Sequence, residues 1–170
     1  MKASEIVRLH TKAKAVKGQF TSKNKTNGNM AAMEVDGKTV YAHSSASYKK
    51  NPAFLGFQGD KKSLILKSRK KKFKTKPVAN SKGIKYDRDV DSEAKLFEYA
   101  ATIAADGKPH TIRFLSQYPM CVSCTGVQKQ FSEMFPDCDV KSVAMKAKRV
   151  KSKYGNDWKK KPWEKKATKK

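Results

Sequence analysis

The chain has 170 residues, and its 39 Lys and Arg residues far outnumber its 15 Asp and Glu residues, giving a formal net charge of +24 and a pI near 10.0. A charge of this size favours a partner with dense negative charge, and nucleic acid is the first partner to consider. Hydrophobic residues make up 38% of the chain, which is enough for one modest core but not for two. No stretch approaches the roughly 20 apolar residues that a membrane span needs, so we expect a soluble protein with no membrane partner. We also expect a monomer.

The first elements along the chain are a helix and a hairpin. Apolar residues spaced three or four positions apart over 1–16 predict a short helix, which a polar loop follows. Two short β-type runs, 29–35 and 39–45, are separated by Asp36 and Gly37. An Asp-Gly pair between two such runs is typical of a tight hairpin turn, so we expect two antiparallel strands here.

Most of the positive charge is concentrated in two segments. Residues 61–86 hold eleven Lys or Arg and no acid, and residues 141–170 hold thirteen Lys or Arg and two acids. We therefore expect two basic appendages on a nearly neutral body: a long insert at 47–89 and a tail at 148–170. Charge runs of this kind can serve solubility alone. Here aromatic side chains lie within or beside both segments, which favours contact with bases and phosphates: Phe54, Phe57, Phe73, Tyr86, Tyr154, Trp158 and Trp163.

The second half of the chain alternates helices with strands. Helical spacing of apolar residues predicts helices over 91–105 and 120–135, and strands are predicted for 110–118 and 139–145. With the hairpin, the order becomes strand, strand, helix, strand, helix, strand. This order predicts an α/β layer structure whose sheet is covered by helices.

Glu93 and the pair Cys121 and Cys124 occupy the first turns of the two predicted helices, with one strand between them. In such a βαβ arrangement both helix starts lie at the same edge of the sheet, so the acid and the thiols can converge. Two thiolates at C-x-x-C spacing can chelate Zn²⁺, and one further protein ligand with a water would complete a catalytic site. Such zinc lowers the pKa of its water to about 7, and a carboxylate that does not bind the metal can carry the protons.

Zinc nucleobase deaminases carry the signature H-x-E followed by P-C-x-x-C. The corresponding segments here are D-S-E-A-K-L at 91–96 and P-M-C-V-S-C-T-G-V at 119–127, with A-H-S at 42–44 on the upstream hairpin. Over roughly residues 29–145 these segments resemble bacterial polymorphic-toxin deaminase domains.

The resemblance implies a cytidine-deaminase-like fold, with three α/β/α layers and a mixed central sheet. It also implies hydrolytic deamination of a base in nucleic acid, with Glu93 as the catalytic residue. The domain would be the toxic C-terminal domain of a secreted toxin and would act in the cytoplasm of a target cell. A cytoplasmic protein is the alternative. An immunity protein is a possible partner. We expect the catalytic domain over 29–147, with the basic insert inside it, a helix and loop at 1–28 before it, and the tail after it.

Two departures from the signature concern the metal. Met120 stands between the proline and the first cysteine, and Asp91 stands where a His or Cys ligand is usual. We predict that His43, Cys121 and Cys124 bind the zinc, because His43 lies where similar toxin domains carry Ala-His-Ser. Asp91 is the alternative ligand, although we expect it to cap the helix, and a third anion would weaken the metal's effect on water.

Simpler interpretations exist for each residue taken alone. An acid such as Glu93 stabilises the start of any helix through the helix dipole. Cys124 lies on the apolar face of its helix and can be a buried core residue, and Cys138 has no partner at ligand spacing. A thioredoxin-like redox role would use C-x-x-C too, but the Trp and Gly-Pro that accompany such a pair are missing. A basic nucleic-acid-binding protein with a structural zinc is the non-enzymatic alternative, yet such sites are closed by four protein ligands.

The preferred substrate follows from access to the base. A base in a duplex must first be extruded, whereas a single strand avoids most of that energetic cost. We therefore expect single-stranded DNA or RNA, and the resemblance favours DNA over RNA and cytosine over adenine.

Overall fold

The computed structural model describes residues 1–21, 28–46, 60, 62–79 and 83–145 of the chain. The tail predicted at 148–170 and residues 47–59 of the basic insert lie outside the described residues. The elements in chain order are α1 (Ala3–Gly18), β1 (Met30–Val35), β2 (Lys38–His43), β3 (Val78–Ala79), β4 (Lys85–Tyr86), α4 (Ser92–Ile103), β5 (Thr111–Ser116), α5 (Val122–Met134) and β6 (Asp139–Ala144).

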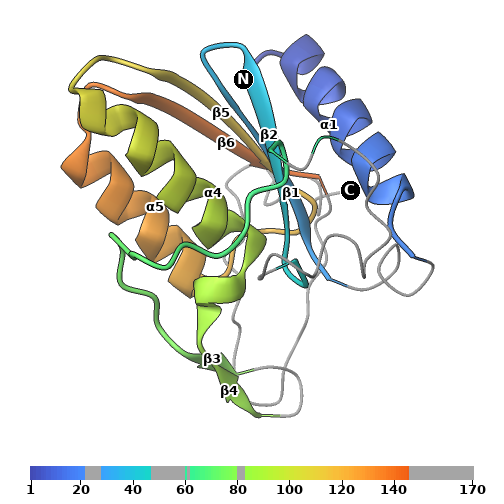
Figure 1. Ribbon diagram of the computed structural model, residues 1–170, viewed down its shortest axis with the longest axis vertical. Helices are drawn as coiled ribbons and strands as arrows, with labels where there is room; N and C mark the ends of the chain where they lie inside the picture. Colours follow the sequence, from blue (N-terminus) through green and yellow to red (C-terminus); the bar gives the residue numbers. More distant parts are fainter. Residues whose placement is uncertain (22–27, 47–59, 61, 80–82, 146–170) are drawn as a thin grey trace, which may run out of the picture.

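A four-stranded mixed sheet lies between two layers of helices (Figure 1). Its strand order is β2-β1-β5-β6, in which β1 is antiparallel to both neighbours and β5 is parallel to β6. Helix α1 covers one face, and α4 and α5 cover the other. The three-layer α/β/α fold with a mixed central sheet is therefore confirmed.

The hairpin forms at the Asp-Gly pair as predicted. Asp36 and Gly37 both have positive φ, at 48° and 85°, and Val35 pairs with Lys38 across the turn. Positive φ at both central residues matches the right-handed twist of the flanking strands, and Gly tolerates it at no steric cost.

Because the sheet is covered on both faces, the buried hydrophobic residues form two clusters, one on each side of the sheet, where the composition predicted one core. A single strand contributes to both clusters. In β5, Phe114 is buried against α4 and α5, whereas its neighbour Leu115 is buried on the α1 side. Successive side chains of a strand point to opposite faces, so two apolar neighbours serve two layers. The α4 and α5 side is the more aromatic, with Phe97 and Phe131 packing at 5.6 Å between ring centroids.

The predicted α4 and α5 are confirmed within a few residues at each end, and both begin at the same edge of the sheet. The basic insert at 47–89 was expected to be a long loop apart from a possible short element at 64–66. In its described part it forms the small β3–β4 hairpin, and Leu64 makes a parallel bridge to Tyr41.

Among the described residues, none of the helices combines the length and the hydropathy of a membrane span.

Candidate active site at the starts of α4 and α5

Three metal-ligating side chains meet where α4 and α5 begin. The Sγ atoms of Cys121 and Cys124 lie 3.6 and 3.4 Å from Oδ2 of Asp91, and the three donor atoms all lie within 4.8 Å of one another. The cysteines are only 2% and 1% exposed. Cys121 is the N-cap of α5, and its sulfur accepts a hydrogen bond from the backbone N–H of Cys124. The local fold of C-x-x-C therefore turns both sulfurs toward the start of α4.

This donor set fits a zinc ion. Zn–S bonds of about 2.3 Å and Zn–O bonds of about 2.1 Å at tetrahedral angles place a sulfur and an oxygen about 3.6 Å apart. The two measured sulfur–oxygen distances, 3.6 and 3.4 Å, match that separation. Thiolates with a carboxylate are also a donor set that zinc accepts.

The side chain of Asp91 does not cap α4, although its position at the helix start predicted that it would. It is the N-cap residue of α4, but its side chain makes no capping hydrogen bond. Its Oδ2 faces the two thiols, and its Oδ1 lies 3.7 Å from Nη1 of Arg88. Burial raises the pKa of Asp91, and the nearby charge of Arg88 opposes that rise. The carboxylate is thus held toward the thiols by a cation on its other side, as metal-binding carboxylates often are.

Glu93 lies beside these three residues, close enough to interact with the charge of Asp91, and both of its carboxylate oxygens accept hydrogen bonds. Its Oε1 accepts from Nδ2 of Asn29 at 2.7 Å and from Oγ of Ser116 at 3.0 Å, and its Oε2 accepts from Oγ of Ser92 at 2.9 Å. Burial, and then the charge of Asp91, raise the pKa of Glu93 to about 7. A carboxyl group with a pKa near neutrality can both accept and donate a proton at physiological pH.

Asn29, just before β1, was not predicted to belong to the site. Its side-chain N–H₂ group donates to Glu93 and, at 2.9 Å, to Oγ of Ser116, while its backbone N–H donates to Oγ of Ser44. Its Oδ1 is buried and has no hydrogen-bond partner among the described residues. One polar residue before a strand carries no pattern that sequence reasoning could have recognised.

Lys95 is the second site residue that the sequence did not reveal. It is 1% exposed, and its Nζ donates to the backbone carbonyls of His43 and Ala46 at 2.9 Å each, with a longer contact to that of Ser44 at 3.4 Å. Burial lowers the pKa of Lys95 to about 7, although the charge of Asp91 favours its protonated form. Lys95 therefore holds the end of β2 against the start of α4. Its one signal in the sequence is its i,i+4 spacing from Asp91.

His43 ends β2 close to this site, because its backbone carbonyl accepts a hydrogen bond from Nζ of Lys95 on α4. Among the described residues, the group that could hold a metal contains Asp91, Cys121 and Cys124 but not His43. The imidazole is fully buried, and its Nδ1 accepts from the backbone N–H of Ser45 at 3.2 Å. Its ring packs edge-on against Phe20 at 4.8 Å. The structure thus brings three of the predicted residues together, Glu93 and both cysteines, and adds Asp91 to them.

A comparison with protein families matches residues 13–146 to Toxin-deaminase, described as the BURPS668_1122 family of deaminases. The chain belongs to this family. It is a toxin deaminase domain of the cytidine-deaminase-like type, and its family chemistry is hydrolytic deamination. No curated protein and no solved structure matches the chain.

Within this toxin deaminase the donor group of Asp91, Cys121 and Cys124 lies inside the matched residues, and so does Glu93. The D-S-E and P-M-C-V-S-C segments that predicted a deaminase site therefore meet in space. Cys138, by contrast, lies immediately before β6 and is absent from the possible metal group among the described residues.

Proposed function

We propose that this toxin deaminase is a zinc enzyme that converts cytosine to uracil in single-stranded nucleic acid, with DNA favoured over RNA. One observation supports it above all: Asp91, Cys121 and Cys124 bring three donor atoms within 4.8 Å of one another at a spacing that suits zinc, and the buried carboxylate of Glu93 lies close enough to interact with the charge of Asp91. Zinc bound there would act as a Lewis acid that makes hydroxide available from water at neutral pH.

The role of Glu93 follows from how it is held. The reaction adds water at C4 of cytosine and releases ammonia, so one proton of the water must reach the ring nitrogen N3 and the other must reach the amine as the C4–N bond breaks. Glu93 would accept each proton from the oxygen and pass it on, first to N3 and then to the amine. Its two oxygens are fixed by Asn29, Ser116 and Ser92. A carboxylate oriented by three donors does not need to reorganise between the two proton transfers.

We propose Asp91, Cys121 and Cys124 as the zinc ligands, with His43 as the alternative third ligand. The arrangement of Asp91 supports this choice, because its Oδ2 lies within 3.6 Å of both sulfurs and no capping hydrogen bond holds it elsewhere. The disadvantage of a third anionic ligand is reduced by two cations, Arg88 and Lys95, whose charges both act on Asp91.

A single-stranded substrate in a target cell fits the composition of the chain. The net charge of +24 supplies the sequence-independent attraction to phosphates, and a base that is already unpaired is the easiest to bring to a buried site. As a toxin domain, the protein would be secreted and act in the cytoplasm of the target cell. An immunity protein would protect the producing cell.

The experiment measures bound zinc by mass spectrometry and uracil formation on a single-stranded oligonucleotide with one cytosine. The wild-type chain should bind one zinc and form uracil, whereas Glu93→Gln should keep the zinc and the thermal stability but form none. Matched substrates with one adenine, with ribose, or with a complementary strand test each preference separately. Zinc binding without any deamination would favour the alternative, a nucleic-acid-binding protein with a structural zinc.

A further inference from the structure

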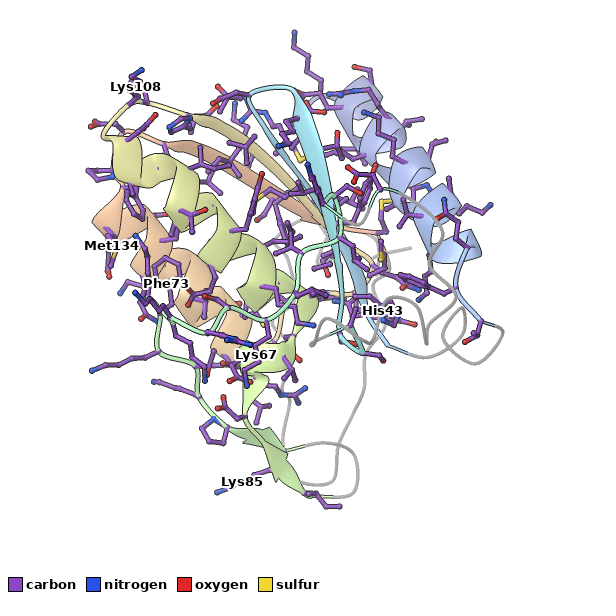
Figure 2. All side chains as sticks on the ribbon, viewed as in Figure 1. His43, Lys67, Phe73, Lys85, Lys108 and Met134 are labelled. Atoms are coloured by element: carbon purple, nitrogen blue, oxygen red, sulfur yellow. The ribbon has the colours of Figure 1, made fainter. Side chains whose placement is uncertain are left out.

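A basic segment of the chain is fixed across the two helices that form the site. Residues 62–79, which we call the strap, cross α4 and α5 and end in β3 (Figure 1). The backbone N–H groups of Lys72 and Phe73 donate to the carboxylate of Glu98 on α4, at 2.9 and 3.0 Å. The Phe73 ring, labelled in Figure 2, is buried. Its centroid lies 6.1 Å from the ring centroid of Phe131. The strap is therefore anchored by the core as well as by hydrogen bonds.

The next anchors of the strap lie on the helix that carries the cysteines. Lys74 exchanges two hydrogen bonds with the side chain of Gln130, each 2.9 Å long, and the backbone N–H of Lys76 donates to Oγ of Ser123 at 2.9 Å. Ser123 is the residue between the two cysteines of C-x-x-C. The backbone of Lys76 is thus in direct contact with the candidate metal-binding turn.

The anchored backbone turns two lysine side chains toward solvent. Phe73 is buried and Thr75 donates its hydroxyl to Asp87, whereas Lys74 and Lys76 are exposed. This alternation is what an extended segment produces when one of its sides faces the protein. In the part of the chain that the structure describes, neither Lys74 nor Lys76 makes an ion pair, unlike their neighbours Lys67 and Lys71, which both pair with Asp89.

We propose that Lys74 and Lys76 bind consecutive phosphates of a single-stranded nucleic acid and lead it to the site at the start of α5. The proposal rests on the proposed function and adds the place where the strand is held. Because hydrogen bonds to Gln130 and Ser123 on α5 already fix the backbone of both lysines, binding a strand costs less conformational entropy than ordering a loop would. Lys67 and Lys71, which form ion pairs with Asp89 and Asp87, instead hold the strap to the fold.

The test compares two double variants that remove the same charge. Lys74→Gln with Lys76→Gln removes the proposed phosphate contacts. Lys38→Gln with Lys108→Gln removes two exposed lysines from the opposite end of the strands, and Figure 2 shows Lys108 far from Lys67 and Lys85. Binding of a fluorescein-labelled 20-nucleotide oligo(dT) with one dC to the full-length chain is measured between 0.1 and 1 M salt.

Each phosphate contact on a single strand adds about 0.7 to the slope of log affinity against log salt, which corresponds to about fivefold in affinity between 1 and 0.1 M salt. The Lys74 and Lys76 double variant should therefore lower the slope by about 1.4 and the affinity at 0.1 M by about 25-fold. The Lys38 and Lys108 double variant should keep the slope. Equal losses in both variants, or none in the first, would overturn the proposal.

Deamination assays on the same proteins separate this proposal from the proposed function. The Lys74 and Lys76 double variant should raise KM for the oligonucleotide while kcat stays within about twofold, because neither side chain belongs to the metal cluster or to the hydrogen bonds of Glu93. If the wild-type chain forms no uracil, the proposed function fails while the binding measurement still decides the role of the lysines. If it forms uracil and the double variant has an unchanged KM and slope, only the lysine proposal fails.

Discussion

Removal of the Asn29 amide tests whether the orientation of Glu93 matters for the reaction. Asn29 donates to Oε1 of Glu93 at 2.7 Å, and the carboxylate keeps its bonds from Ser116 and Ser92 in the Asn29→Ala variant. A hydrogen bond to a charged group contributes about 1.5–3 kcal/mol, and if that contribution is realised in the transition state, kcat falls about 10- to 150-fold. The zinc content should not change, because Asn29 is not among the metal-ligating residues.

The assay is uracil formation at saturating oligonucleotide, with zinc content and thermal unfolding measured on the same samples. Asn29→Asp is the informative companion, because it keeps the size of the side chain but places a second carboxylate beside Glu93. Like charges at hydrogen-bond distance repel, so its kcat should fall further than that of Asn29→Ala. A folded, zinc-loaded Asn29→Ala protein with kcat within twofold of wild type would refute the orienting role.

Three further predictions concern the metal, the buried lysine and pH. Asp91→Asn should lose zinc while His43→Ala retains it; the reverse pattern would make His43 the third ligand. Lys95→Met should lower the free energy of unfolding by about 1–3 kcal/mol for each buried carbonyl left unpaired, which denaturant titration measures against wild type. His110 donates to Asp36 and Asp106, which raise its pKa, so its contribution to stability is present below its usual pKa and lost as pH rises through the raised value. His110→Gln should therefore lower Tm more at pH 6 than at pH 9, and an equal loss at both pH values would contradict this.

The sequence predicted those parts of the fold that depend on local pattern. The apolar spacing of α4 and α5 and the Asp-Gly turn each have a physical cause within a few residues, and each formed as expected. The βαβ order also predicted that Glu93 and the two cysteines meet at one edge. The strap was not predicted, because its conformation depends on acceptors such as Glu98 and Gln130 that are 25 or more residues away.

Asp91, the third candidate metal ligand, also has a role that local sequence patterns could not predict. Asp91 has the residue type and the position of a helix cap, and a local rule therefore predicts a cap. Its actual contacts are with two sulfurs from another helix, 30 and 33 residues further along the chain. Asn29 and Lys95 are similar, since each acquires its role from an element that local sequence does not place beside it. Single polar residues of this kind become recognisable only when the sheet order is known.

The distribution of charge connects the acidic site to the basic exterior. The chain carries +24, yet the cluster at the starts of α4 and α5 contains two carboxylates and two thiols, all buried or nearly so. A phosphate would be repelled by these acidic groups, whereas a nucleobase carries no net charge. On the proposed function, the exposed Lys74 and Lys76 hold the phosphates outside while a single base enters among the acids. A strand whose bases remain paired and stacked cannot satisfy both requirements at once, which agrees with the single-stranded substrate that we propose.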